Sequence, residues 1–456
     1  MTRLKALFIL LIALSLSHTV LAYHPKTSDQ FVVITDLHFN PYASCNNTLP
    51  CPLIDALQQA PISQWERLLK KAQPNNVSYG SDTNYPLMQS AFNELSNKIA
   101  LEKPSFVVVL GDILAHDYRK NYMRYASLNT QESYQAFTIK TIEFLNTKLT
   151  HAFPSTDIYM TIGNNDTYGD HYDYNPDGQI YKDIVTPWSN LLSNTDNRAA
   201  MQEEFPVGGY YAVTIPEYPM LRLIVMNTVL FSLSAKGNDV DKAAKEELDW
   251  LQNELDHASA KNQKILIALH IPPGVDAFSS AKLKSTIELW KPEYTERFMT
   301  EIEPHSASIS AILAGHYHMD FFQIIKNHPN ADPILVLGTP AISPLFGNNP
   351  GFKVYRFSTQ HFEISDAKTY YYSINDIQKW QQEYDFNKIY QPDCQHCQLM
   401  DAVSSLTQTS AGAERYKYFY GVGTNSQPIT DADSWHNYWC SMYNVFATDY
   451  QTCLKS

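Results

Sequence analysis

The sequence is poor in positive charge, and the little that it has is scattered. Its 456 residues include 34 Lys and Arg against 47 Asp and Glu, which gives a formal net charge of −13 at pH 7. It contains no run of Lys and Arg that could follow a phosphate backbone, so we expect no nucleic-acid-binding surface. An acidic protein can still bind an anionic small molecule if metal ions reverse the local charge.

Long apolar stretches are missing beyond the N-terminus. The apolar run at residues 6–16 follows Arg3 and Lys5, and Val20, Leu21 and Ala22 are residues that a cleavage site at Ala22 would tolerate. This run is shorter than the ~20 residues of a membrane-spanning helix. We therefore predict a signal peptide at residues 1–22 and no transmembrane segment in the mature chain, which is exported to a secreted or periplasmic (extracellular or lumenal) location. An uncleaved membrane anchor is the alternative.

Cysteines are few, and they fall in close pairs. Because short loops close at little entropic cost, local disulfides are the expected arrangement for an exported chain. A Cys-x-x-Cys zinc or redox site at residues 394–397 is the alternative, but a second Cys pair at zinc spacing and a thioredoxin-like strand are both lacking. The expected pairs are Cys45 with Cys51, Cys394 with Cys397, and Cys440 with Cys453.

Internal repeats and low-complexity segments are absent too, and 18% charged residues indicate a globular chain. Its hydrophobic patterns alternate between strands and helices, which indicates an α/β fold. From about residue 373 the strands are expected to stop, so we divide the mature chain into a domain at 23–372 and a mostly helical, disulfide-stapled region at 373–456. Strands are expected within 31–38, 106–110, 158–162, 210–215, 221–227, 265–269, 309–314, 334–337 and 352–357, and helices near 63–71, 88–101, 132–149 and 242–257.

Metal-ligand side chains follow five of these buried strands. The carboxyl ends of strands in an open α/β sheet lie at one edge, where such folds place their sites, so we expect these side chains to converge. Glycines precede several of them and allow a close approach of the backbone. The candidates, in chain order, are Asp36 and His38, Asp112, Asn164, His270, and His316 with His318.

This mixture of oxygen and nitrogen ligands predicts the metal. Asp, Asn and His suit Zn, with Mn or Fe as alternatives, and not Ca. The candidates are too many for one tetrahedral ion but can hold two divalent ions if one carboxylate bridges. Asp112 is the expected bridge, because it follows a central strand.

The order of these motifs resembles the calcineurin-like metallophosphoesterases, and the string from Gly111 to Asp117 resembles the acid sphingomyelinase-like phosphodiesterase branch. The resemblance covers most of residues 31–357, and it implies a four-layer α/β/β/α sandwich with a helical, Cys-containing C-terminal subdomain. It also implies the division of ligands: one ion on Asp36, His38, Asp112 and His318, and the other on Asp112, Asn164, His270 and His316.

The implied chemistry is hydrolysis of a phosphodiester. Two adjacent ions lower the pKa of a shared water, and the resulting hydroxide attacks phosphorus in line. In the branch two histidines flank the leaving group; His116 matches one, whereas Asn165 stands where the other is expected. We therefore predict His116 as the general acid.

Three readings of Asn165 stay open. It can hydrogen-bond a phosphoryl oxygen but cannot donate a proton near neutral pH, so His116 would act alone. Alternatively, the substrate is a phosphoanhydride of a nucleotide or of polyphosphate, whose leaving group needs less help; endopolyphosphatases related to this branch carry the same asparagine. In the third reading the chain binds metal and a small-molecule phosphate ester with little turnover.

Overall fold

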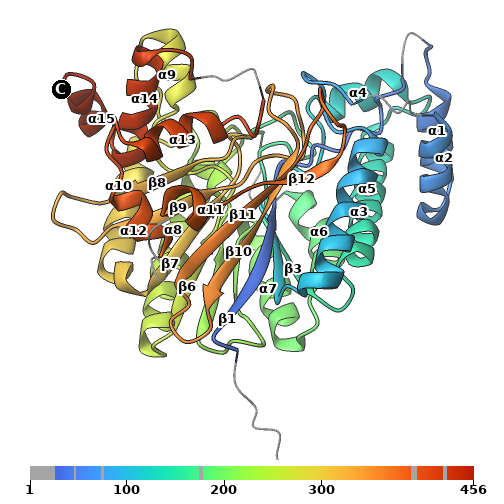
Figure 1. The fold of residues 1–456 in the computed structure, drawn as a ribbon. Coiled ribbons are helices and arrows are strands. Elements are labelled where there is room, and N and C mark those ends of the chain that lie inside the picture. Colours follow the sequence, from blue (N-terminus) through green and yellow to red (C-terminus); the bar gives the residue numbers. More distant parts are fainter. Residues whose placement is uncertain (1–25, 46–47, 73–76, 174–177, 392–397, 425–428) are drawn as a thin grey trace, which may run out of the picture.

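Two six-stranded mixed sheets form the centre of the molecule (Figure 1). The computed structural model describes residues 26–45, 48–72, 77–173, 178–391, 398–424 and 429–456. Across the first sheet the strands are β12 (Trp380–Asp385), β11 (Ile364–Tyr372), β10 (Gly351–Ser358), β1 (Ser28–Ile34), β2 (Phe106–Val109) and β3 (Asp157–Met160). Across the second they are β4 (Tyr211–Thr214), β5 (Leu221–Val225), β6 (Lys264–Ala268), β7 (Ile309–Ala314), β9 (Ile334–Gly338) and β8 (Phe322–Ile325).

The strands that lead to the candidate ligands are parallel and buried. β1, β2 and β3 run parallel in the first sheet, as do β5, β6, β7 and β9 in the second. Their apolar and β-branched residues suit strands that are covered on both faces. The Phe31 and Phe106 rings stack 4.7 Å apart between β1 and β2. Because the strands are parallel, their carboxyl ends share one edge of each sheet.

Helices cover the outer faces of the sheets, which gives the predicted α/β/β/α sandwich (Figure 1). The helices expected near 63–71, 88–101, 132–149 and 242–257 are present as α2 (Trp65–Ala72), α3 (Tyr85–Glu102), α5 (Gln131–Ala152) and α8 (Val240–Ala260). The helices are α1 (Pro52–Gln59), α2 (Trp65–Ala72), α3 (Tyr85–Glu102), α4 (Tyr118–Tyr125), α5 (Gln131–Ala152), α6 (Gln179–Ser189), α7 (Thr195–Gly208), α8 (Val240–Ala260), α9 (Ala277–Leu283), α10 (Pro292–Ile302), α11 (Phe386–Tyr390), α12 (Leu399–Ser404), α13 (Ala411–Phe419), α14 (Ala432–Tyr443) and α15 (Ala447–Cys453).

The expectation that strands stop near residue 373 is wrong. β12 begins at Trp380 and pairs with β11, and β10 pairs antiparallel with β1 in the middle of the first sheet. β11 and β12 carry many polar and half-buried residues, so they lack the continuous apolar run that marks the parallel strands. The part after β12 is helical in the described residues, from α11 to α15.

Two of the three expected disulfides are confirmed. Cys45 bonds to Cys51, and Cys440 bonds to Cys453. The pair at 394–397 and the signal peptide at 1–22 lie outside the described residues. Among the residues that are described, no helix combines the length and the apolarity needed to cross a bilayer.

A buried polar cluster joins the two sheets. Asp320, between β7 and β8, accepts hydrogen bonds from Lys353 Nζ at 2.5 Å, Thr369 Oγ1 at 2.8 Å and the Tyr384 hydroxyl at 2.9 Å. These three partners stand on β10, β11 and β12 of the other sheet. The Asp320 amide donates to the Tyr420 carbonyl at 3.0 Å, which attaches the C-terminal helices to the same point. The cluster therefore holds the loop after β7 against the first sheet.

We expect Lys353→Met to destabilise the protein by about 3–5 kcal/mol, because the change leaves the buried Asp320 carboxylate without its counter-charge. The double variant Lys353→Met, Asp320→Asn removes both charges and should be less destabilised than the single variant. Denaturant unfolding of the three proteins measures the difference. A single variant within about 1 kcal/mol of the parent would contradict a structural role for the ion pair.

Candidate metal centre

Five of the seven candidate ligands share an unusual backbone conformation. Asp36, His38, Asp112, His316 and His318 have φ values of 48°, 42°, 52°, 72° and 65°. Positive φ is uncommon for residues other than glycine, and it persists where the surrounding structure enforces it, often at functional sites. The strand ends therefore turn sharply at the residues that carry the ligand atoms, which directs several side chains into one volume.

Two glycines let these turns approach each other. A Cβ at Gly163 would overlap the amide nitrogen and side chain of Asp112, and a Cβ at Gly315 would overlap Thr35 Oγ1 and come within 2.9 Å of Asp36 Oδ2. Any larger residue at either position would push apart the loops that carry Asp112 and Asp36. The glycines thus serve the close packing of one ligand loop on another.

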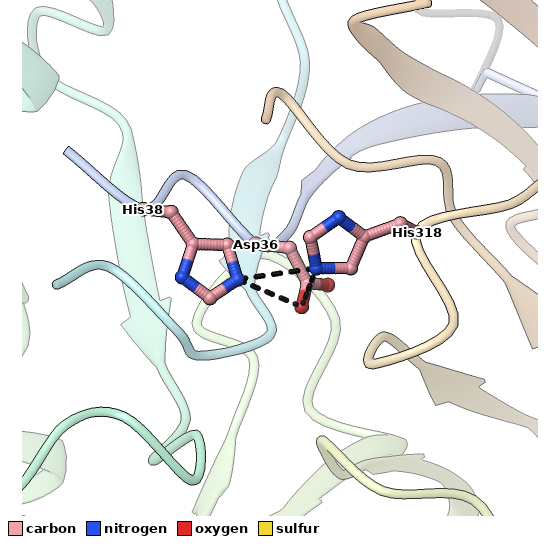
Figure 2. A group of neighbouring side chains, drawn as sticks. All are labelled: Asp36, His38 and His318. Atoms are coloured by element: carbon pink, nitrogen blue, oxygen red, sulfur yellow. Dashed lines mark hydrogen bonds and ion pairs between the residues drawn. The ribbon is translucent and has the colours of Figure 1, made fainter. Parts of the chain in front are cut away.

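Asp36, His38 and His318 form one group, shown in Figure 2. The Nε2 atoms of the two histidines are 3.1 Å apart, and they lie 3.7 Å (His38) and 3.2 Å (His318) from Asp36 Oδ1. The other ring nitrogen of His38 lies 3.0 Å from the Leu114 carbonyl, which fixes the orientation of that ring. All three side chains are buried.

A second group lies beside the first and brings in the other sheet. His270 Nε2 lies 3.4 Å from Asp112 Oδ2, 3.2 Å from Asn164 Oδ1 and 4.0 Å from Asp36 Oδ1. His270 Nδ1 lies 2.7 Å from the Leu110 carbonyl, at the end of β2, so a residue after β6 is oriented by the first sheet. Asp112 Oδ2 is also 3.5 Å from His38 Nε2, which makes the two groups continuous.

His316 stands at the margin of this cluster. Its amide donates to Asp36 Oδ2 at 3.0 Å, and its ring centroid lies 5.2 Å from that of His270. Two residues that no spacing in the sequence predicts also contact the cluster. The Tyr172 hydroxyl lies 3.5 Å from His316 Nε2, and the Thr35 hydroxyl donates to Asp36 Oδ2 at 2.6 Å. Thr35 directly precedes Asp36, but a threonine at a strand end carries no signal of its own.

The carboxylates and two of the histidines shift each other's pKa. Burial by itself would lower the pKa of His38, but the charges of Asp112 and Asp36 outweigh it and raise the pKa to about 9. The same balance raises the pKa of His270 to about 9. Burial would raise the pKa of Asp36, yet neighbouring imidazoles hold it well below its usual range. The carboxylates therefore remain charged at neutral pH.

The cluster has the negative charge and the unshared lone pairs that a cation site requires. Asp36 Oδ1 is buried and accepts no hydrogen bond from the described residues. Burial lowers the pKa of His316 to about 3 and lowers that of His318, so both rings are neutral and keep a lone pair for a metal. Buried carboxylates and neutral imidazoles together are what divalent ions require, so these residues fit the two ions expected from the sequence.

The candidate acid lies at the edge of the cluster, beside a residue that the sequence analysis missed. The His116 ring stacks on that of His38, with centroids 4.2 Å apart, and its side chain is 31% exposed. Asp82 accepts a hydrogen bond from the His116 amide at 2.9 Å and lies 3.0 Å from Nδ1. Asp82 follows no strand, so no spacing in the sequence could have connected it with His116.

Asn165 faces Asp112. Its amide nitrogen donates to Asp112 Oδ1 and its Nδ2 donates to Asp112 Oδ2, both at 2.7 Å. Asp166 accepts from the amides of Ile113 at 2.9 Å and Gly163 at 3.0 Å, so it ties the loop after β2 to the loop after β3. Asn165 and Asp166 therefore hold the Asp112 carboxylate and its loop in place.

Comparison with known proteins finds relatives along most of the chain. A family model described as calcineurin-like phosphoesterase matches residues 30–320, a span that contains every candidate metal ligand. Acid sphingomyelinase-like phosphodiesterase 3b of Mus musculus is 23% identical over 442 residues, which are 93% of this chain and 90% of the relative. Sphingomyelinase phosphodiesterase D of Dictyostelium discoideum is 24% identical over 454 residues, 94% of each chain. Cyclic GMP-AMP phosphodiesterase SMPDL3A of Mus musculus is 22% identical over 444 residues, 93% of this chain and 92% of the relative.

We expect the chelator-treated protein to lose stability as the pH rises from 7 to 9. His38 and His270 have folded pKa values of about 9 against an ordinary 6.5, so the stability that their protonation contributes is complete below pH 6.5 and disappears as the pH passes 9. A divalent metal bound here would take the place of these protons, so the increase in melting temperature on adding zinc should grow over the same range.

Thermal unfolding with and without zinc, at several pH values, measures both effects. The control is the double variant His38→Gln, His270→Gln, in which the dependence between pH 7 and 9 should flatten. An equal slope in the parent and the double variant would refute the assignment of the two histidines.

Proposed function

We propose that this chain, which belongs to the calcineurin-like phosphoesterase family, is an exported phosphodiesterase that uses two divalent metal ions to hydrolyse small-molecule phosphodiesters. The observation that carries the proposal is the continuous group of buried Asp, Asn and His side chains where the carboxyl edges of the two sheets meet. Family membership makes the chain a metal-dependent phosphoric ester hydrolase. The ligand assignment, the identity of the metal and the substrate are parts of the proposal.

The proposed ligands are those expected from the sequence, with Asp112 shared between the ions. Asp36, His38 and His318 complete one site, and Asn164, His270 and His316 complete the other. The distances between side-chain ligand atoms support this division, because the ring nitrogen nearest to Asp36 is that of His318 at 3.2 Å, whereas the ligand oxygen nearest to His270 Nε2 is that of Asn164 at 3.2 Å. We propose zinc, with manganese or iron as alternatives, because the ligands mix imidazole with oxygen. When bound, two such ions activate water and neutralise the charge that develops on the phosphoryl oxygens.

His116 is the proposed general acid. Asp82 engages its Nδ1, so Nε2 is the atom that we assign to the leaving oxygen. The two contacts with Asp82 also fix the direction of the ring, so that Nε2 points away from the carboxylate. The partial exposure of His116 lets a substrate reach it, in contrast to the proposed metal ligands, which are buried except for the partly buried His316.

The contacts of Asn165 favour a single acid. Both of its hydrogen bonds are given to Asp112, so we assign it to holding that carboxylate and not to the leaving group. With His116 as its single acid, the enzyme can still protonate an alcohol leaving group. A phosphoanhydride, whose leaving group is already a weak base, is the alternative substrate, because it would need His116 less.

The choice among diesters comes from the relatives. Their names include acid sphingomyelinase-like phosphodiesterases, sphingomyelinase phosphodiesterases and cyclic GMP-AMP phosphodiesterases. We propose a diester of one of these two classes, a sphingomyelin-like head-group ester or a nucleotide diester. Export directed by a signal peptide at residues 1–22 is consistent with the two disulfides, because disulfides form in oxidising compartments.

The proposal predicts product release from the zinc-loaded protein with a dinucleotide or sphingomyelin as the substrate. The same protein is assayed with a nucleoside triphosphate and polyphosphate, and Asp112→Ala is the control, with circular dichroism and metal content measured in parallel. Turnover that disappears in Asp112→Ala, while the fold is kept, supports the two-metal assignment. Release of phosphate from triphosphate or polyphosphate alone would favour the anhydride, and metal binding without turnover on any substrate would leave a binding protein.

We expect His116→Gln to reduce the hydrolysis of diesters with alkyl alcohol leaving groups by about 10²- to 10⁴-fold, the usual contribution of a general acid. Hydrolysis of a p-nitrophenyl diester should change far less, because p-nitrophenolate leaves without a proton. Asp82→Asn should show the same pattern with a smaller loss, since an amide oxygen can still accept from Nδ1. Equal losses on both kinds of diester would show that His116 acts on something other than the leaving group.

A further inference from the structure

An exposed phenyl ring covers the side of the site where the candidate acid lies. Phe346 is 57% exposed, and among the described residues Phe278 is the other phenylalanine with such exposure. Its ring centroid lies 4.6 Å from that of His318 and 6.1 Å from that of His116. The plane of the Phe346 ring is inclined by 72° to the His318 ring and by 89° to the His116 ring, so it meets both rings edge to face. Phe346 therefore contacts a proposed metal ligand and the proposed acid, while more than half of its surface remains available.

The turn that carries Phe346 is held firmly in place. The Gly347 amide donates to the Pro344 carbonyl at 3.2 Å, which closes the turn, and the Gly80 amide donates to the same carbonyl at 3.1 Å. The Ser343 amide donates to the carbonyl of Asp36 at 3.1 Å. Asn348, which is fully buried, donates its side-chain amide to the Ser343 carbonyl at 3.0 Å. The turn that carries the ring is thus hydrogen-bonded to the segment that carries the proposed metal ligand Asp36, so a ligand that packs on the ring loses little entropy in ordering it.

The position of the ring defines the part of the substrate that it meets. In an in-line displacement the leaving oxygen departs on the side opposite the attacking water, and a general acid must lie within reach of that oxygen. His116 marks that side. The group attached to the leaving oxygen therefore extends from His116 across the adjacent surface, where Phe346 is the exposed apolar side chain in ring contact with it.

We propose that Phe346 is a specificity-determining residue that packs against a planar aromatic leaving group, of which a nucleoside is the common biological class. This inference rests on the proposed function and refines it from phosphodiesters in general to nucleotide diesters.

The surroundings of the ring favour a nucleoside over a lipid. An acyl chain needs a continuous apolar surface, whereas the neighbours of Phe346 at the site are imidazoles. A hollow of about 200 Å³ lies beside the turn at Pro344, and its lining combines polar side chains, among them Asn40, Asp82 and Asn84, with the apolar Val77 and Leu87. One apolar platform with polar groups next to it matches a base attached to a sugar, because bases stack through their faces and bond through their edges.

The test compares two substrates that share the retained nucleotide and differ in the leaving alcohol: a dinucleotide, which releases a nucleoside, and the methyl ester of the same mononucleotide, which releases methanol. We expect Phe346→Ala and Phe346→Leu to lower kcat/KM for the dinucleotide by about 5- to 100-fold, the range of one stacked base. Both variants should hydrolyse the methyl ester within about three-fold of the parent. Leucine keeps the apolar volume but lacks a flat face, so Phe346→Leu should not restore kcat/KM for the dinucleotide.

Binding provides a second readout that is independent of turnover. Inhibition by the released nucleoside should weaken in both variants, whereas inhibition by inorganic phosphate and the metal content should not change. Phe278→Leu, which alters another phenylalanine of similar exposure (53%) on α9, serves as the control for surface aromatics and should behave like the parent.

The outcomes separate the two proposals. If the parent hydrolyses neither substrate nor sphingomyelin, the proposed function fails. If it hydrolyses sphingomyelin alone, the proposed function stands and the nucleoside leaving group is refuted. If the parent hydrolyses the dinucleotide and Phe346→Ala does so equally well, the proposed role of Phe346 is refuted and the proposed function stands. Rescue by leucine would refute a planar leaving group and indicate an aliphatic one, and sphingomyelin turnover lost in Phe346→Ala but kept in Phe346→Leu would identify it as a lipid.

Discussion

The structure depends on one electrostatic constraint, the burial of two carboxylates beside several imidazoles where two sheets meet. Asp36 is fully buried and Asp112 nearly so, and their side chains are 0% and 3% exposed in the ion pairs that they form with histidines. Such charges are expensive to desolvate unless opposite charge surrounds them. Without a metal, protons on His38 and His270 supply that charge, which is why their pKa values rise to about 9. With metals in place those protons leave, so folding, metal binding and pH are linked through the same atoms.

A site of this kind also requires the loops to be held against their mutual repulsion. Three devices do so at increasing distance from Asp112. Asn165 gives it two hydrogen bonds, and Asp166 ties its loop to the neighbouring one. Farther away, the ion pair of Lys353 and Asp320 closes the second sheet on the first, two residues beyond His318. The positive φ angles at the strand ends are strained, and they persist because this framework holds the backbone in place.

The parts that could be predicted from the sequence are those whose geometry is local. A buried strand followed by Asp-x-His or Gly-Asp places its ligands at a known edge, because strand direction and pleat determine where they point. Asp82 could not be found in this way, since it lies on a loop 34 residues before His116 and only tertiary packing brings them together. β11 and β12 were missed because their side chains are partly polar, so burial in those strands comes from the C-terminal helices and not from an apolar pattern of their own.

The two sides of the site face different demands, and the residues divide accordingly. The metal side is buried, polar and rigid, so it can recognise a phosphoryl group but cannot distinguish what is attached to it. The acid side is open, and there the chain has one partly exposed histidine, an aspartate that orients it and one exposed phenyl ring. An exposed ring on a well-anchored turn contributes nothing to the core, since its apolar surface remains in water. That surface leaves water only when another group covers it. In the proposed mechanism, specificity therefore resides on the leaving-group side, where Asn165 stands in place of a second acid and His116 lies beside Phe346.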